Sequence, residues 1–421
     1  MKAPWHQAPG STPGPLHYPA FRAALASRVV SGLGSWMQIV AAGWLVYDIT
    51  ESAAAVGVLT IASKGPGLFL SSWGGELADR HDRRRIVVIS SSIQSAFAAL
   101  LAVLAWDGET SVLAIYFPVL GMGIANSLAS PAQTALVMGT VPHELLQRAT
   151  GMASVSYNVA RLAGPAIGGV VVATAGAGAC FALNSLSDVI YVLLIVSLPL
   201  AAGSHATRKI PLRSAAETAF EDPLLRVFLI VALTFSLTVA PIQELAPAIA
   251  RSQGDGAHLL GFMLAALAVG GLAGNWIRTR YEMRIDQQRL LGAALIGSAA
   301  SLALVAMIAP TSFTVVSQSV EFALILLGMI FLGSAWDILF VVCLTGLQLA
   351  REELSGVMTG FFFTVTLGGL SLGAILLGAL FDRIEIAGGL LVCSILLLFA
   401  GGFYLRRPLH LKAAMGAGRT G

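Results

Sequence analysis

The sequence predicts an all-α membrane protein with twelve transmembrane helices in two pseudo-symmetric halves of six. Three observations predict this fold class: 56% of the 421 residues are hydrophobic, only 11% are charged, and the apolar residues fall in runs of about 20. A water-soluble protein carries about 25% charged residues, because its surface must be hydrated. The 45 glycines fit helices whose backbones approach closely in lipid.

Each predicted helix is an apolar run long enough to cross the hydrocarbon core of a bilayer. The runs are 26–47, 54–76, 86–106, 112–138, 149–173, 178–200, 226–248, 258–277, 288–308, 318–344, 356–381 and 386–405. The segments that connect these runs are short, except for the one between the sixth and seventh runs.

The long connecting segment divides the chain into two predicted six-helix halves, 26–200 and 226–405. Residues 1–25 and 406–421 are predicted tails, and 201–225 is a predicted linker. The segments His143–Met152 and Glu352–Phe361, which lie 209 residues apart, share four identical positions. Such self-similarity is typical of transporters built from internal repeats.

The distribution of basic residues predicts the orientation. With both termini in the cytoplasm, all but four of the 25 Lys and Arg residues lie in cytoplasmic segments. The exceptions are Arg251 and Arg383 in outside loops, and Lys64 and Arg161 within spans. Because positive residues favour the cytoplasmic side, we expect a multi-pass protein of a bacterial-type inner membrane with both termini inside.

The loop between the second and third predicted helices is strongly charged in a chain with few charges. It cannot lie in hydrocarbon, so it is an aqueous loop. A carboxylate there can pair with arginines or with the positive N-terminus of a neighbouring helix. The loop residues that we single out are Gly75, Asp79, Arg80, Arg83 and Arg84. The alternative for the arginines is a topological anchor that meets anionic lipid.

The fifth predicted helix carries small residues at regular spacing and one proline. A spacing of four residues places glycines on one face, which lets another helix approach, and the proline removes a backbone hydrogen bond. The set is Gly151, Gly164, Pro165, Gly168 and Gly169. It predicts a hinge and seal in the outer half of the bundle; ordinary close packing is a compatible alternative.

Both patterns resemble motifs of the major facilitator superfamily. The loop is similar to G-x-x-x-D-R-x-G-R-R, with Asp82, a residue that tolerates left-handed backbone, where glycine is usual. The helix resembles the antiporter motif G-x8-G-x3-G-P-x-x-G-G, with Ala160 replacing one glycine. Further phrases resemble the branch of secretion effectors and drug exporters that includes enterobactin exporters: Phe21-Arg22, Ser35-Trp36-Met37-Gln38, Gly43-Trp44-Leu45-Val46-Tyr47, Asn158-Val159-Ala160-Arg161 and Phe181-Ala182-Leu183-Asn184.

The resemblance implies a transporter that rocks two halves around a central cavity lined by helices 1, 4, 7 and 10. It implies that Asp79 contacts the eleventh helix and latches the halves in the outward-facing state. The antiporter-like pattern is associated with export by exchange rather than uptake. The resemblance also implies a monomer.

Ionisable residues within predicted spans are candidates for coupling and substrate binding, because each needs a partner or a watery cavity. The candidates are Lys64, Arg161, Asp188 and Asp337, together with the amides Asn158 and Asn184. An acid beside a fixed arginine can couple proton entry to a conformational switch. The alternatives are a static buried pair of Asp188 with Arg161 or Lys64, and amides that only join helices.

Several function classes are disfavoured by the sequence. It has no phosphate-binding Gly-x-x-x-x-Gly-Lys-Ser/Thr motif, no metal-spaced His/Cys cluster and no basic nucleic-acid patch, so we expect no cofactor, no metal and no nucleic acid. No nucleophile and base set indicates an enzyme. We therefore expect proton-coupled export of an amphipathic small molecule, such as a drug, siderophore or metabolite. The alternatives are an importer of a small nutrient and a non-transporting sensor or assembly protein.

Overall fold

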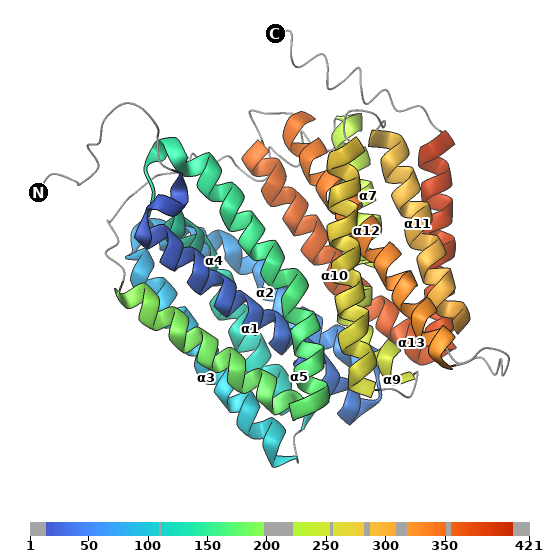
Figure 1. Cartoon of the computed structure of the whole chain (residues 1–421), viewed down its shortest axis with the longest axis horizontal. Helices are drawn as coiled ribbons and strands as arrows, with labels where there is room; N and C mark the ends of the chain where they lie inside the picture. The colour runs from blue at the N-terminus through green and yellow to red at the C-terminus, as the bar shows by residue number, and fades with distance from the viewer. Residues whose placement is uncertain are drawn as a thin grey trace, which may run out of the picture.

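The computed structural model describes residues 14–108, 111–197, 222–252, 256–281, 287–308, 318–350 and 355–406. Every element in these ranges is helical (Figure 1). Most of the two predicted tails and of the predicted linker 201–225 lies outside the described residues.

The first group of helices contains five long elements. They are α1 (Pro19–Thr50), α2 (Ala53–Arg80), α3 (Arg83–Asp107), α4 (Val112–Met138) and α5 (Leu146–Ser197), with 3₁₀ turns at Pro15–His17 and His143–Leu145. Helix α5 contains two spans, because the chain reverses at Gly176, whose φ of 81° glycine adopts without strain. The break therefore falls between the predicted spans 149–173 and 178–200.

The second group follows the linker. It comprises α7 (Pro223–Thr238), α8 (Pro241–Glu244), α9 (Ala246–Ser252), α10 (Gly256–Tyr281), α11 (Gln287–Ile308), α12 (Gln318–Ala350) and α13 (Ser355–Arg406). Helix α13 also contains two spans, which meet at Ile384 and Glu385. Ten helical segments among the described residues are long and apolar enough to cross a membrane, and two of them, α5 and α13, are double length. The predicted all-α fold with twelve spans is confirmed.

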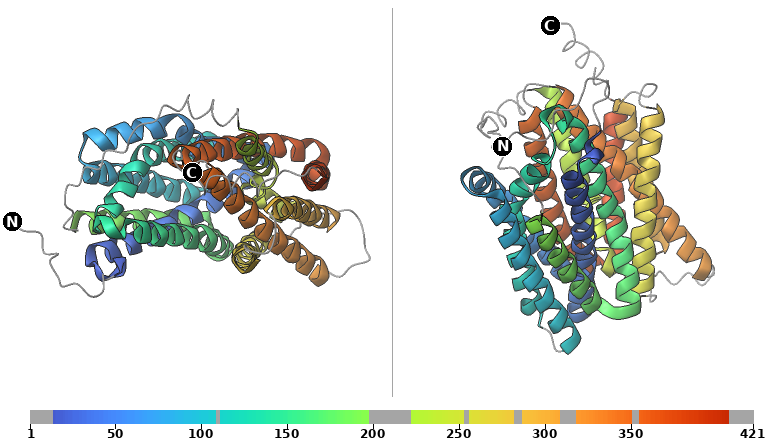
Figure 2. Two further views of the ribbon diagram at one scale, coloured as in Figure 1. Left: turned by 90° about the horizontal axis from the view of Figure 1, so that it is seen from above. Right: turned by 60° about the vertical axis from the view of Figure 1, so that its left-hand side comes forward.

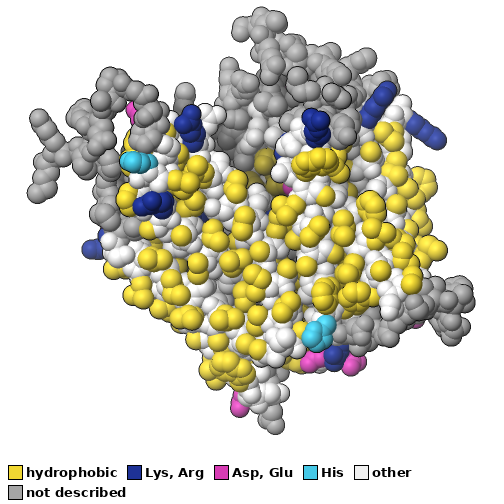
Figure 3. All heavy atoms as spheres, in the orientation of Figure 1, with side chains coloured by type: hydrophobic (Ala, Val, Ile, Leu, Met, Phe, Trp, Pro, Cys, Tyr) yellow, Lys and Arg dark blue, Asp and Glu magenta, His cyan; other side chains and the backbone are white. Residues whose placement is uncertain are grey.

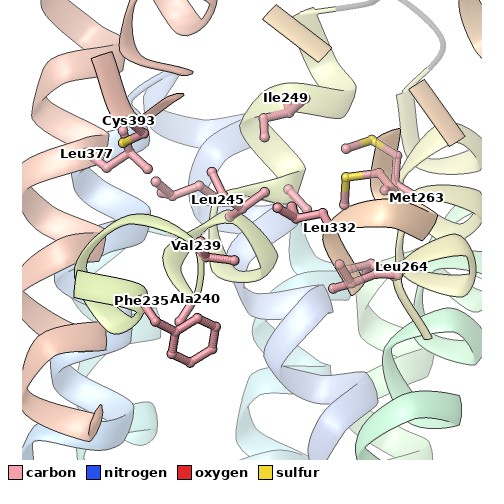
Figure 4. Close-up of a cluster of buried hydrophobic side chains, with 14 of the residues drawn as sticks. Phe235, Val239, Ala240, Leu245, Ile249, Met263, Leu264, Leu332, Leu377 and Cys393 are labelled. Atoms are coloured by element: carbon pink, nitrogen blue, oxygen red, sulfur yellow. The ribbon is translucent and has the colours of Figure 1, made fainter. Parts of the chain in front are cut away.

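The seventh predicted span, 226–248, is divided into three short helices. Pro241 begins α8 and Pro247 lies at the start of α9, and neither can donate a backbone hydrogen bond. Leu245 and Ile249 of this broken segment lie among Met263 of α10 and other buried apolar side chains (Figure 4). Burial of these side chains holds the irregular segment in place, and its backbone turns bring Glu244 to the interior.

Two extensive helix–helix contacts join the groups, in addition to smaller contacts of α1 with α8 and α9 and of α2 with α8. Within the first group α1 packs on α5 and α2 on α4, and within the second α10 packs on α12 and α11 on α13. Across the groups α2 packs on α13 and α5 packs on α10 (Figure 2).

The two ends of the bundle differ in what they contain. We call the end where α1 begins and α13 ends the terminal end, and the end where α5 turns at Gly176 the far end (Figure 1). Apolar side chains cover the visible sides between them (Figure 3). Large exposed apolar residues such as Phe69, Leu113 and Phe399 suit a surface that faces lipid tails.

Candidate transport cavity

A cavity of about 430 Å³ lies mainly within the first helix group. Hydroxyl and amide side chains, among them Thr60, Gln94, Asn126 and Gln133, form much of its lining. The second group contributes only Glu244 of α8 and Leu367 of α13 to the described lining. Of the predicted lining by helices 1, 4, 7 and 10, the first and fourth spans contribute many residues and the seventh contributes Glu244, whereas the tenth span, α12, contributes none of the described lining residues.

Lys64 of α2 faces this cavity. Its Nζ lies 4.9 Å from the centroid of the Trp36 ring on α1, within range of a cation–π contact. None of the ion pairs among the described residues includes Lys64. Glu244 is close enough to feel the charge of Lys64, although the two are not within ion-pair distance. The sequence does not predict this contact, because no local pattern joins α1 to α2.

Asp188 of α5 also lines the cavity. Its Oδ1 accepts a 2.7 Å hydrogen bond from Ser31 Oγ, and its Oδ2 is buried with no hydrogen-bond partner. The residue is 3% exposed and has no ion pair to Arg161 or Lys64 among the described residues. The static pair considered from the sequence is therefore absent here. A buried carboxylate oxygen without a partner leaves room for a proton or a ligand donor.

The two predicted amides have different surroundings. Asn184 is fully buried, and its Nδ2 donates to Gln38 Oε1 at 2.6 Å, which joins α5 to α1. Asn158 is exposed and donates to Ser154 O on its own helix at 3.0 Å. Only Asn184 lies at the cavity.

Arg161 lies at the interface between the groups. Its guanidinium carbon is 5.9 Å from the centroid of the Trp336 ring on α12, and both residues line a small separate pocket. Asp337 follows Trp336 and is close enough to feel the charges of Arg161 and Arg278. The structure thus brings Arg161 and Asp337 together and places Lys64 and Asp188 elsewhere.

Three of the four singled-out glycines of α5 are close-packing positions. A Cβ on Gly164 would lie 2.5 Å from Trp36 Cβ, and one on Gly168 would lie 2.9 Å from Met37 Cα. A Cβ on Gly169 would overlap Gly261 of α10, so this glycine permits contact between the groups. Pro165 lies beside the small Arg161 pocket. Gly151 has open space around it, and nothing in its surroundings requires glycine.

The far end is closed by contacts between the groups. Asp382 of α13 accepts hydrogen bonds from the Ala53 and Ala54 backbone nitrogens at 2.8 and 3.1 Å, and from Ser52 Oγ at 2.6 Å. This carboxylate therefore caps the N-terminus of α2 from the other group. Nearby, glycine positions on α2 and α13 let the two backbones touch: a Cβ on Gly57 would lie 2.5 Å from Ala374 O.

A second contact at the far end is electrostatic. Arg251 of α9 pairs with Asp48 Oδ1 of α1 at 2.7 Å and stacks over Trp44 at 5.5 Å. Sequence analysis missed Asp382, Arg251 and Asp48 as functional residues. Each lies near a helix end, where charges are ordinary, and their pairing spans 203 to 330 positions of sequence.

The charged loop lies at the terminal end. Asp79 is exposed and has no hydrogen bond or ion pair to another described residue. Arg80 pairs with Glu76 on its own helix at 2.6 Å, and Arg83 Nε donates to Ala78 O at 3.3 Å. Among the described residues, the predicted contact of Asp79 with the eleventh span is not present in this arrangement.

Two positions of the loop differ from expectation. Asp82 has extended backbone, with φ −62° and ψ 111°, and its Oδ1 accepts from the Arg84 backbone nitrogen at 2.8 Å. It therefore caps α3, and the glycine of the usual motif is not needed for a left-handed turn. Gly75 has open space, whereas a Cβ on Gly74 would lie 2.7 Å from Leu128 O. Close packing of α2 on α4 depends on Gly74.

Within the described ranges, no group of three His, Cys, Asp or Glu side chains is arranged to hold a metal ion. The three cysteines are free and buried.

Comparison with known proteins agrees with this architecture. The chain matches the transmembrane secretion effector family over residues 10–416. It is 26% identical over 285 residues to the enterobactin exporter EntS of Citrobacter koseri, covering 67% of this chain and 68% of the relative. It is 28% identical over 261 residues to EntS of Escherichia coli O1:K1, covering 61% of this chain and 62% of the relative. The alignments thus span about two thirds of these exporters.

Solved structures show the same fold at low identity. The nucleoside transporter NupG has a TM-score of 0.75 at 15% identity, covering 92% of this chain and 100% of that chain. A D-xylose–proton symporter has a TM-score of 0.69 at 13% identity, covering 92% and 98%. With a family match over nearly its whole length and this fold, the chain belongs to the transmembrane secretion effector family of major facilitator transporters.

Proposed function

We propose that the protein is a proton-coupled exporter of an amphipathic small molecule, working by alternating access with the terminal end in the cytoplasm. One observation carries the proposal: a polar cavity lies between helices whose far end is joined across the two groups. A cavity closed at one end is the arrangement that an alternating-access transporter needs when it accepts a solute from the other end. The exporters among its relatives support export over uptake.

The most suitable proton site in the cavity is Asp188. It is buried, its Oδ2 has no hydrogen-bond partner, and Ser31 holds its other oxygen. Proton binding at Oδ2 removes a buried charge, so it changes the interactions of α5 with α1 in the first group. The proposal includes a monomeric transporter, as the resemblance implies.

The test is efflux of substrate from cells that overproduce the protein, measured with and without an uncoupler. We expect accumulation of substrate to fall with the protein present, and the effect to disappear when the proton gradient is collapsed. Asp188→Asn should abolish dependence on the gradient, whereas Asp107→Asn, an exposed residue at the far end, should leave it unchanged. Efflux that persists after collapse of the proton gradient would contradict proton coupling. Net uptake of the substrate into the cells would favour an importer.

A further inference from the structure

We propose that Lys64, stacked on Trp36, binds the acidic group of an aromatic organic anion, and that such anions are the substrate class of the cavity. The inference rests on the exporter function proposed above and names what that site recognises.

The first support is the incomplete neutralisation of Lys64. The residue lies within the hydrophobic span of α2 and borders the cavity, and no described carboxylate is within ion-pair distance of it. A cation inside a membrane requires a partner or a watery cavity. The Trp36 ring at 4.9 Å supplies only the attraction of an aromatic face, which leaves the ammonium hydrogens available to an anion in the cavity.

The second support is the aromatic wall beside this ammonium. Trp36 and Tyr157 meet edge to face, with ring centroids 6.3 Å apart, and both line the cavity. Tyr157 is 53% exposed, so its ring surface is available on the cavity side. An aromatic ring of a ligand can pack against this pair while its acidic group reaches Lys64.

The third support is the placement of the acids. Asp188 is bound to Ser31, five residues before Trp36 on α1, a separation of about 7.5 Å along the helix axis. Glu244 is nearer to Lys64 electrostatically, but it belongs to the second group and is not paired with Lys64. An anion at Lys64 therefore competes with Glu244 and does not displace Asp188.

The experiment compares three probes that share one ring system: 2-naphthoate, 2-naphthamide and 2-naphthylmethylammonium. Their binding to the purified full chain in detergent at pH 7 is measured by isothermal titration. We expect 2-naphthoate to bind at least about tenfold more tightly than the other two, because only it forms a charge-assisted contact with Lys64. Equal affinity for the acid and the amide, including no detectable binding of either, would overturn the proposal.

Variants locate the effect. Lys64→Gln should remove the preference for the acid, and Lys64→Arg should retain it, since both cations can meet an acidic group. Arg148→Gln, which removes an exposed charge on α5 away from the cavity, is the matched control and should behave as the parent. If Lys64→Gln does not fold, the Glu244→Gln variant tests the proposal instead. Removal of the carboxylate that competes for Lys64 should tighten the binding of 2-naphthoate several-fold. An unchanged preference in Lys64→Gln, or weaker binding in Glu244→Gln, would contradict the assignment.

The binding result is separate from the exporter function. If Lys64→Gln loses the preference for the acid but still exports neutral dyes, both proposals are supported. Binding of 2-naphthoate by a protein that exports no tested compound would contradict the function and leave the anion site standing. Export of 2-naphthoate by Lys64→Gln at the parent rate would contradict the anion site and leave the exporter function standing.

Discussion

The two ends of the helix bundle carry their charges in different ways. At the far end, charges from one helix group are bound to the other: Asp382 caps α2, and Arg251 pairs with Asp48. At the terminal end, Asp79 is exposed, and Arg80 pairs within its own helix. The difference teaches that charge density alone does not locate a gate. The charged loop is the most conspicuous charged segment of the sequence, yet in this arrangement the sparse charges at the far end join the groups.

This comparison suggests a division of roles between the ends. Contacts at the far end stabilise the arrangement in which that end is closed, whereas Asp79 is available to stabilise the opposite arrangement. Four substitutions test this division, with far-end opening read from spin labels on Thr174→Cys and Arg383→Cys, which are exposed on different groups. The three native cysteines are buried.

The largest effect is expected from Gly57→Ala. The new methyl would lie 2.5 Å from Ala374 O, a backbone atom that cannot rotate away, and overpacking of this kind costs about 1–3 kcal/mol. The population with an open far end should rise by roughly tenfold or more. Gly297→Ala, where a Cβ meets open space, is the control. Unchanged label distances in Gly57→Ala would show that the α2–α13 contact is not part of the seal.

Asp382→Asn should have the next largest effect. The neutral amide keeps the shape but loses the charge that faces the α2 N-terminus and one acceptor oxygen, a loss of about 1 kcal/mol for a partly exposed cap. We expect the open population to rise about five-fold. Asp107→Asn at the same end should have no effect. If Asp382→Asn and Asp107→Asn gave the same distances, Asp382 would not contribute to closure of the far end.

Arg251→Gln should have a smaller effect. Both partners of its pair are about half exposed, with 52% and 43% of the side-chain surface accessible, and such pairs contribute about 0.2–1 kcal/mol. The shift toward an open far end should shrink as salt is raised, since screening weakens the parent's pair. Arg280→Gln serves as a charge-matched control. A shift independent of salt would indicate that packing of Arg251 on Trp44 matters more than its charge.

Asp79→Asn should leave the far-end distance unchanged. This carboxylate has no contact to a described residue in the far-closed arrangement, so its neutralisation does not alter that arrangement directly. Transport should nevertheless fall, because the predicted latch acts in the other arrangement. Full transport activity in Asp79→Asn would favour a protein that keeps the fold without an alternating-access cycle.

The spans were predictable because hydrophobic runs and their glycine and proline interruptions are local properties. The predicted run 112–138 coincides with α4, and Gly176 lies between two predicted spans. Pro241 and Pro247 also signalled a broken helix, but apolar residues on both sides concealed the interruption within one run.

The site was predictable only in part, because its contacts join distant segments. Lys64 and Asp188 were identified from the energetic penalty of charge in a membrane, which requires no knowledge of partners. The partners Trp36 and Ser31, and the cap formed by Asp382, depend on tertiary packing. Asp82 was unexpected for a different reason: the resemblance suggested a glycine turn, whereas the chain uses an aspartate cap.

The most direct test of the central claim is a paired distance measurement by double electron–electron resonance on the Asp382→Asn variant. One labelled pair is Thr174→Cys with Arg383→Cys at the far end, and the other is Arg148→Cys with Arg406→Cys at the terminal end. If the two groups alternate around the cavity, the far-end distance lengthens and the terminal-end distance shortens in the same population. Lengthening at the far end with an unchanged terminal end would mean local fraying and would contradict alternating access.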